Sequence, residues 1–261
     1  MFTRAEETID EKGFSNFKKA VISMLLGLAG FFGAYFSLNF SAGDFSLSIV
    51  WSTFIPLLAA MAYGEKFGLV AGTLGLGAFF PFFIWTNNGW ACLLSSLGYL
   101  QFFVWHGYFA VRRSKFSGPW FDSLVIQLPS VLFYGAIIYL LYPPCFLYNP
   151  PFWAPDAQTF MPPQTVSSIA LKSPLIMCMV TILSAFVLRI SEVRLLFGLP
   201  VKKCSRGNGP VFMATVSSSL ASWLLMLVFD DIFIGKDSPG FFPLINSPFE
   251  IISFVIIMSA G

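Results

Sequence analysis

The chain has 261 residues, of which 56% are hydrophobic, 18% aromatic and only 11% charged, and its mean hydropathy is +0.76. Soluble domains carry about 25% charged residues, so this composition excludes an ordinary water-soluble domain. The net charge of +2 is too small to indicate a nucleic-acid-binding surface. Long apolar stretches instead predict an all-α fold, a polytopic transmembrane helical bundle whose main partner is the lipid bilayer.

Residues 1–19 are predicted to form a cytoplasmic tail, because their acidic, mixed character differs from the short basic start of a secretory signal peptide. Residues 20–261 then form one multi-span domain. Since about 20 apolar residues are needed to cross ~30 Å of hydrocarbon, each apolar stretch counts as one span. The expected spans are 20–38, 45–63, 67–84, 90–111, 121–142, 166–188, 211–229 and one from 249 onward.

The fifth and eighth spans carry signals about their ends. Pro143 and Pro144 are expected to end the fifth span, because proline cannot continue a helix. The eighth, "PFEIISFVIIMSAG", is still apolar at Gly261, so we expect about eight spans with the last one truncated. This pattern favours a chain that forms the membrane-embedded input part of a longer protein.

The lysines and arginines predict the orientation of the spans. With the amino terminus in the cytoplasm, thirteen of the fifteen fall on the cytoplasmic side, and only Lys172 and Lys236 fall outside. Cytoplasmic loops carry an excess of basic residues. We therefore expect a multi-pass protein of a bacterial inner (plasma) membrane with a cytoplasmic amino terminus.

The sequence contains no complete catalytic constellation. No Asp or Glu lies in the middle of a predicted span, where ion-coupled carriers usually place one. The four cysteines lack the spacing of a metal site, and no cofactor motif is present, so neither a metal nor a cofactor is predicted. Cys92 and Cys145 both fall on the outer side, where an oxidising compartment would allow them to pair.

The outer end of the third predicted span offers the best candidate ligand site. In "AFFPFFIWTNNGW", the side chains of Asn87 and Asn88 stand between Trp85 and Trp90. A few polar groups beside rigid aromatic walls are typical of a small-molecule site, and the ligand would be apolar or weakly polar. Turn chemistry explains "NNG" equally well, because Asn and Gly tolerate positive φ.

Four further polar residues have both a functional and a structural interpretation. Lys172, near the outer start of the sixth span, is either a fifth ligand-binding residue or a lysine that snorkels to the interface. His106 is predicted to be an interfacial residue of the aromatic belt. Gln101, like Gln127 in the next span, is expected to form a hydrogen bond between helices, and a ligand contact is the alternative.

The segment 51–115, roughly a quarter of the chain, resembles the amino-terminal multi-span sensor regions of bacterial sensor histidine kinases. The resemblance is carried by "PLLAAMAYGEKFGLVAGTLGLGAFFPFFIWTNNGW" and "FFVWHGYFAVRRSK". It implies a signalling input domain of a two-component system that works as a homodimer and passes its signal through the last helix. The chain contains no phosphoacceptor-histidine helix and no nucleotide-binding motif. A small permease, or the substrate-binding membrane component of a transporter, is the alternative.

Overall fold

The computed structural model describes residues 14–42, 45–113, 123–188 and 190–200. This part of the chain is helical apart from one β-hairpin, so the all-α prediction is confirmed in its coarse form. The elements are α1 (Asn16–Gly33), η1 (Ala34–Phe36), β1 (Leu38–Ala42), β2 (Phe45–Ile49), η2 (Trp51–Thr53), α2 (Phe54–Tyr63), α3 (Glu65–Gly72), α4 (Pro81–Ile84), η3 (Thr86–Asn88), α5 (Trp90–Arg113), α6 (Ser123–Leu147), α7 (Pro163–Val187) and α8 (Ser191–Leu196).

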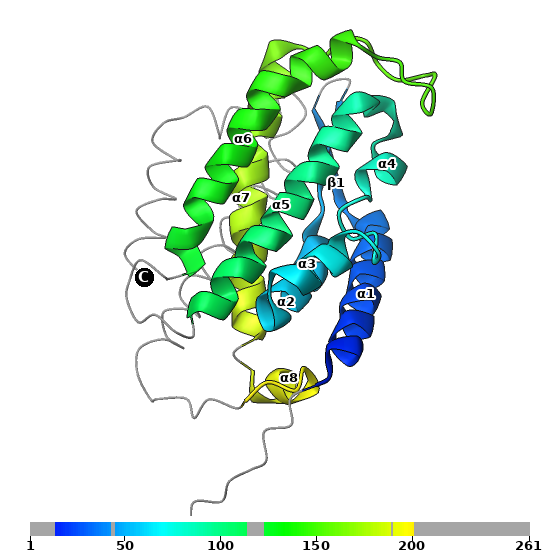
Figure 1. Ribbon diagram of the computed structural model, residues 1–261. Coiled ribbons are helices and arrows are strands. Elements are labelled where there is room, and N and C mark those ends of the chain that lie inside the picture. The colour runs from blue at the N-terminus through cyan, green and yellow to red at the C-terminus, as the bar shows by residue number, and fades with distance from the viewer. Residues whose placement is uncertain (1–13, 43–44, 114–122, 189, 201–261) are drawn as a thin grey trace, which may run out of the picture.

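Three long helices, α5, α6 and α7, lie side by side and form one half of the bundle (Figure 1). The shorter helices α1, α2 and α3 pack on one another, and α2 also contacts α5 and α7. Chain direction alternates from α5 to α7, so the turn at 85–90 and the loop 148–162 meet at one end. At the other end α8 lies across the bundle.

The predicted span 45–63 is wrong as a single helix. Its first part is strand β2, which pairs antiparallel with β1 so that Leu38 faces Ile49 and Ala42 faces Phe45. Helix α2 begins only at Phe54. Alternating Ser and apolar residues in "FSLSI" follow the period of a strand rather than that of a helix, and this pattern explains the error.

The predicted span 67–84 is also wrong as a continuous helix. Helix α3 ends at Gly72, and the chain passes through a turn region before α4 begins at Pro81. Glycine is a poor helix former, and in this turn region the absence of a side chain lets the backbone approach α1 closely. A Cβ at Gly75 would lie 2.7 Å from Gly27 Cα and 2.7 Å from the carbonyl oxygen of Met24, so this turn packs directly on the α1 backbone.

Helix α6 continues past the two prolines that were expected to end it, and it reaches Leu147. Pro143 and Pro144 remove two backbone donors, so the helix bends over toward the loop that follows (Figure 1). The predicted spans 90–111 and 166–188 correspond closely to α5 and α7. The predicted spans 211–229 and 249 onward lie outside the described residues.

Two helical segments among the described residues, Asn16–Phe36 and Leu128–Leu147, are long and apolar enough to cross a membrane. The end of the bundle at which α8 lies also holds the start of α1, the start of α3 and the end of α5. The basic residues of these segments are Lys18, Lys19, Lys66, Arg112 and, in α8, Arg194. Which side of a membrane this end faces stays a prediction from the sequence.

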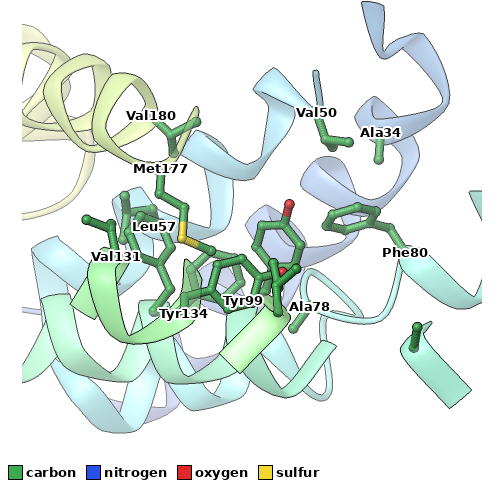
Figure 2. Close-up of a cluster of buried hydrophobic side chains, with 14 of the residues drawn as sticks. Ala34, Val50, Leu57, Ala78, Phe80, Tyr99, Val131, Tyr134, Met177 and Val180 are labelled. Atoms are coloured by element: carbon green, nitrogen blue, oxygen red, sulfur yellow. The ribbon is translucent and has the colours of Figure 1, made fainter. Parts of the chain in front are cut away.

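One buried cluster joins the two halves of the bundle. Side chains of α2 (Leu57), α5 (Tyr99), α6 (Tyr134) and α7 (Met177) meet in it, as Figure 2 shows. Leu57 is completely buried, and Tyr134 is 2% exposed. Burying a large apolar side chain stabilises a fold by about 1.5–3 kcal/mol in water. Within a bilayer the corresponding gain comes from close packing instead.

Candidate ligand pocket beneath the loop 148–162

The loop 148–162 is fastened to the start of α5 by the side chain of Asn149. Its Oδ1 accepts a hydrogen bond from the backbone N–H of Trp90 at 3.0 Å. Its Nδ2 donates to the carbonyl oxygens of Asn88 at 3.2 Å and Gln158 at 2.6 Å. The backbone N–H of Gln158 donates in turn to the carbonyl oxygen of Asn87 at 2.9 Å. We call the loop 148–162 and the turn 85–90 together the cap.

Gly89 makes this contact sterically feasible. Its φ is +56°, a conformation that residues with a side chain rarely adopt. A Cβ at this position would also collide with the side-chain amide of Asn149. Glycine is therefore required here both by the backbone conformation and by the close approach of Asn149.

Aromatic rings reinforce the cap. The ring centroid of Trp153 lies 4.6 Å from that of Trp90 in an edge-to-face arrangement, and 6.1 Å from that of Phe82. The ring centroid of Phe152 lies 4.9 Å from that of Trp153, with the two planes nearly perpendicular. Such pairs contribute about 0.5–1.5 kcal/mol each beyond their buried area. Trp90 is thereby held from two directions, by the backbone bond to Asn149 and by the ring of Trp153.

A pocket of about 590 Å³ lies directly below the cap, between α5 and α6. It is lined by Trp90, Leu93, Leu94, Leu97, Leu141, Pro144, Cys145 and Tyr148. On α5 the lining residues follow the spacing i, i+3, i+4 and i+7, which is one face of an α-helix. On α6 the lining is Leu141, Pro144 and Cys145, and Tyr148 follows as the first residue of the loop. Ligand sites usually have volumes of about 300–1,000 Å³ and mostly apolar walls, so this pocket has the size and the chemistry of a binding site.

The structure brings four of the five predicted site residues into one turn, but most of their contacts are structural. Trp85 packs on Phe80 with ring centroids 5.5 Å apart, and its carbonyl oxygen accepts the thiol of Cys92. The backbone carbonyls of Asn87 and Asn88 hold the loop, while the Asn87 side chain is exposed. Only Trp90 lines the pocket.

Lys172, the fifth predicted site residue, lies on α7, and its side chain is outside the part of the structure that is described. The other wall of the pocket, made by three residues of α6 and by Tyr148 of the loop, was not predicted. The spacing of these residues, seven from Leu141 to Tyr148, mirrors that from Trp90 to Leu97. This matching spacing was the signal that could have identified them.

A buried polar layer lies behind the pocket. The hydroxyl groups of Ser95 and Tyr142 share a hydrogen bond between α5 and α6, and Ser95 also donates to the carbonyl oxygen of Ala91 at 2.9 Å. Lower in the same interface, Gln101 donates to Ser130 at 3.0 Å, which confirms the predicted bond between helices. These bonds fix how α5 and α6 face each other.

The structure places His106 differently from the prediction. It was predicted to lie in an aromatic belt at the interface, but it is 3% exposed and packs inside the bundle. Its Nδ1 lies 2.9 Å from the carbonyl oxygen of Phe102, and its Nε2 lies 3.4 Å from the hydroxyl of Thr181 on α7. A carbonyl only accepts, so Nδ1 carries a proton. The Thr181 hydroxyl donates its one proton to the carbonyl oxygen of Met177 at 2.9 Å, so its approach to Nε2 is a contact between α5 and α7.

Cys92 and Cys145 are free thiols in the structure, so the pairing considered from the sequence is not present. Cys92 is buried below Trp85, and Cys145 is partly buried in the pocket wall. Among the described residues there is no group of three or more His, Cys, Asp or Glu side chains that could hold a metal ion.

No protein-family model, curated protein or solved structure matches this chain.

Proposed function

We propose that this chain is a membrane-embedded ligand-binding input domain of a bacterial signal-transduction protein. The observation that carries the proposal is the pocket beneath the cap, which is apolar, close to 590 Å³ and walled by two long helices. Its ligand is a small apolar or weakly polar molecule. Trp85, Asn87 and Asn88 hold the turn above the site, and Trp90 contacts the ligand.

The proposed membrane setting is supported by the two apolar helices and by the basic residues at one end of the bundle. In the proposed arrangement about eight spans cross a bacterial inner membrane, with the amino terminus and the basic end in the cytoplasm. The cap then lies on the outer side. Helices α5 and α7 are included as spans because of their length. They have 24 and 25 residues, and a helix of 24 residues extends about 36 Å at 1.5 Å per residue.

Signal transfer would use the contacts of α5. This helix forms one wall of the pocket at its outer end, and its inner half touches α7 through His106 and Thr181. A ligand that favours one spacing of α5 and α6 therefore also favours one position of α7. The predicted last span would pass this shift to a cytoplasmic output module. A homodimer and a histidine-kinase output are proposed from the resemblance to sensor kinases alone.

One observation favours the alternative, a substrate-binding membrane component of a transporter. Helix α3 stops at Gly72, and the chain stays irregular until α4 begins at Pro81. Transporters often build their sites from such discontinuous helices. Uptake of a radiolabelled solute by cells that express the chain would support this alternative, whereas ligand binding without uptake supports the input domain.

The binding proposal is tested with 1-aminoanthracene, an uncharged aromatic dye whose fluorescence rises in apolar cavities. The purified full chain in lipid nanodiscs is compared with Leu97→Trp, which places a larger side chain in the pocket wall. The matched control is Leu132→Trp, because position 132 lies two and a half turns before Leu141 and so on the opposite face of α6. We expect Leu97→Trp to weaken dye binding by about tenfold or more, which corresponds to about 1.4 kcal/mol. Equal binding by all three proteins would overturn the proposed site.

A further inference from the structure

The pocket beneath the cap is an elongated slot that runs along the helix axes. On α5 the lining extends from Trp90 to Leu97. On the α6 side it extends from Leu141 to Tyr148, the first residue after the helix. Seven residues of α-helix correspond to about 10 Å at 1.5 Å per residue. The two helices run in opposite directions, so the start of α5 and the end of α6 lie at the same end of the bundle (Figure 1). Trp90 and Tyr148 are the cap residues that line this end of the slot.

The lining of the slot suits hydrocarbon rather than a charged or strongly polar group. Four leucines and one proline make up most of it, and none of its eight residues carries a charge. A charged ligand would lose its hydration without gaining a partner, which costs several kcal/mol. The two strongest donors in the lining, the indole N–H of Trp90 and the hydroxyl of Tyr148, are both at the cap end.

The slot opens sideways at the depth of the membrane. Its α6 wall belongs to the segment Leu128–Leu147, which is apolar enough to cross a bilayer. Leu97 and Leu141, at the end away from the cap, are 52% and 45% exposed, and the neighbouring Leu140 is 65% exposed. These side chains face hydrocarbon in the proposed membrane position. An occupant can therefore enter from within the bilayer, with no passage through water.

We infer that the slot holds one acyl chain of a glycerolipid from the outer leaflet. This inference rests on the proposed function and specifies its ligand. Acyl chains lie along the membrane normal, as the slot does, and ~10 Å is well within one leaflet of a hydrocarbon core of about 30 Å. Trp and Tyr side chains concentrate at the boundary between hydrocarbon and headgroups. Trp90 and Tyr148 thus lie at the level of the lipid's ester carbonyl groups, which accept their hydrogen bonds.

With an acyl chain as its ligand, the pocket would respond directly to the packing of the surrounding lipid. An inserted chain keeps α5 and α6 apart at the outer end, while the bond between Ser95 and Tyr142 holds them together behind the slot. An empty slot would let the leucine face of α5 close on the opposite wall, which carries Leu141, Pro144 and Cys145. Occupancy therefore sets the angle between α5 and α6, and any change in acyl-chain length or order changes the occupancy.

Photo-crosslinking tests the inference. The purified full chain is placed in nanodiscs with a phosphatidylcholine that carries a diazirine in one acyl chain, irradiated, and digested for mass spectrometry. Adducts are expected on the peptides that contain 90–97 and 141–148, at least about tenfold above those on the opposite face of α6 around Leu132. Leu97→Trp is expected to reduce them about tenfold, and Leu132→Trp to leave them unchanged.

Two outcomes would overturn the inference. Adducts spread evenly over both faces of α6 would mean that lipid only surrounds the helix, and a slot without adducts would mean that another segment or molecule fills it. If 1-aminoanthracene binding still depends on Leu97 in either case, the proposed binding function stands and only the acyl-chain ligand is rejected. The double variant Trp90→Phe, Tyr148→Phe keeps the ring volumes and removes both donors. An adduct yield equal to that of the unaltered chain would remove the ester contact from the inference.

Discussion

The side-chain oxygen of Asn149 lies 3.0 Å from the backbone nitrogen of Trp90, 59 residues earlier in the chain. The same side chain donates to the backbone of Asn88 and Gln158, and it is only 8% exposed. One amide group thus joins the loop 148–162, the turn 85–90 and the first residue of α5. This buried side chain fixes the backbone of Trp90 in the pocket wall, and the ring of Trp153 packs on its indole.

Asn149→Ala is expected to destabilise the protein by about 1–3 kcal/mol, because it leaves buried backbone groups without partners. Thermal unfolding of the purified chain in nanodiscs measures the loss. Dye binding should weaken as well, since Trp90 loses its anchor. The matched control is Asn87→Ala, whose exposed side chain has only a long contact of 3.5 Å with Thr86. That variant should stay within about 0.5 kcal/mol of the unaltered protein. Similar losses in both variants would show that Asn149 has no special role.

The bond between Ser95 and Tyr142 can be measured with a double-mutant cycle. Ser95→Ala, Tyr142→Phe and the double variant are compared by their free energies of unfolding. Hydrogen bonds between membrane helices average about 0.6 kcal/mol in such cycles, with a maximum of about 1.7. We expect a value in the upper half of that range, because both residues are buried and Tyr142 is 2% exposed. A coupling energy of zero would mean that the bond does not hold α5 to α6.

Helix positions followed from hydrophobicity wherever one long apolar run forms one helix, as in α5 and α7. The same rule failed for 45–63 and 67–84. There, strand alternation in "FSLSI" and the glycines from Gly72 to Gly77 override apolar content. Mean hydropathy measures burial or lipid contact and does not report which backbone conformation a segment adopts. Local residue type determines that choice.

Only part of the candidate site, the turn 85–90, was predicted from the sequence. The turn 85–90 was identified because its tryptophans and asparagines are close together in the sequence. The α6 wall and Asn149 were missed because they approach the turn only through the fold, across separations of 59 and 61 residues for the Asn149 bonds. Asn87 and Asn88 were assigned to ligand binding, but in the structure their carbonyl groups bind the loop.

Gly98→Ala tests how closely α5 and α6 pack. A Cβ at Gly98 would overlap the ring of Tyr134, which is buried. Alanine is the better helix former by about 1 kcal/mol, whereas overpacking a core costs about 1–3 kcal/mol. We expect the steric cost to prevail, with a lower midpoint of thermal unfolding. Combining Gly98→Ala with Tyr134→Leu should cost less than the sum of the two single changes. An additive or stabilising result would contradict the contact.

Cysteine labelling in intact cells tests the proposed orientation. In a variant whose four native cysteines are replaced by alanine, single cysteines are introduced at Thr159 in the cap and at Lys66 at the basic end; both positions are exposed. With the cap on the outer side, a membrane-impermeant maleimide should label Thr159→Cys in intact cells, and Lys66→Cys only after the cells are permeabilised. The reverse pattern would place the basic residues outside, contrary to the positive-inside rule. It would also assign the acyl chain in the slot to the cytoplasmic leaflet. Labelling at both positions in intact cells would show that the bundle does not separate the two compartments, and the proposed spans would have to be reassigned.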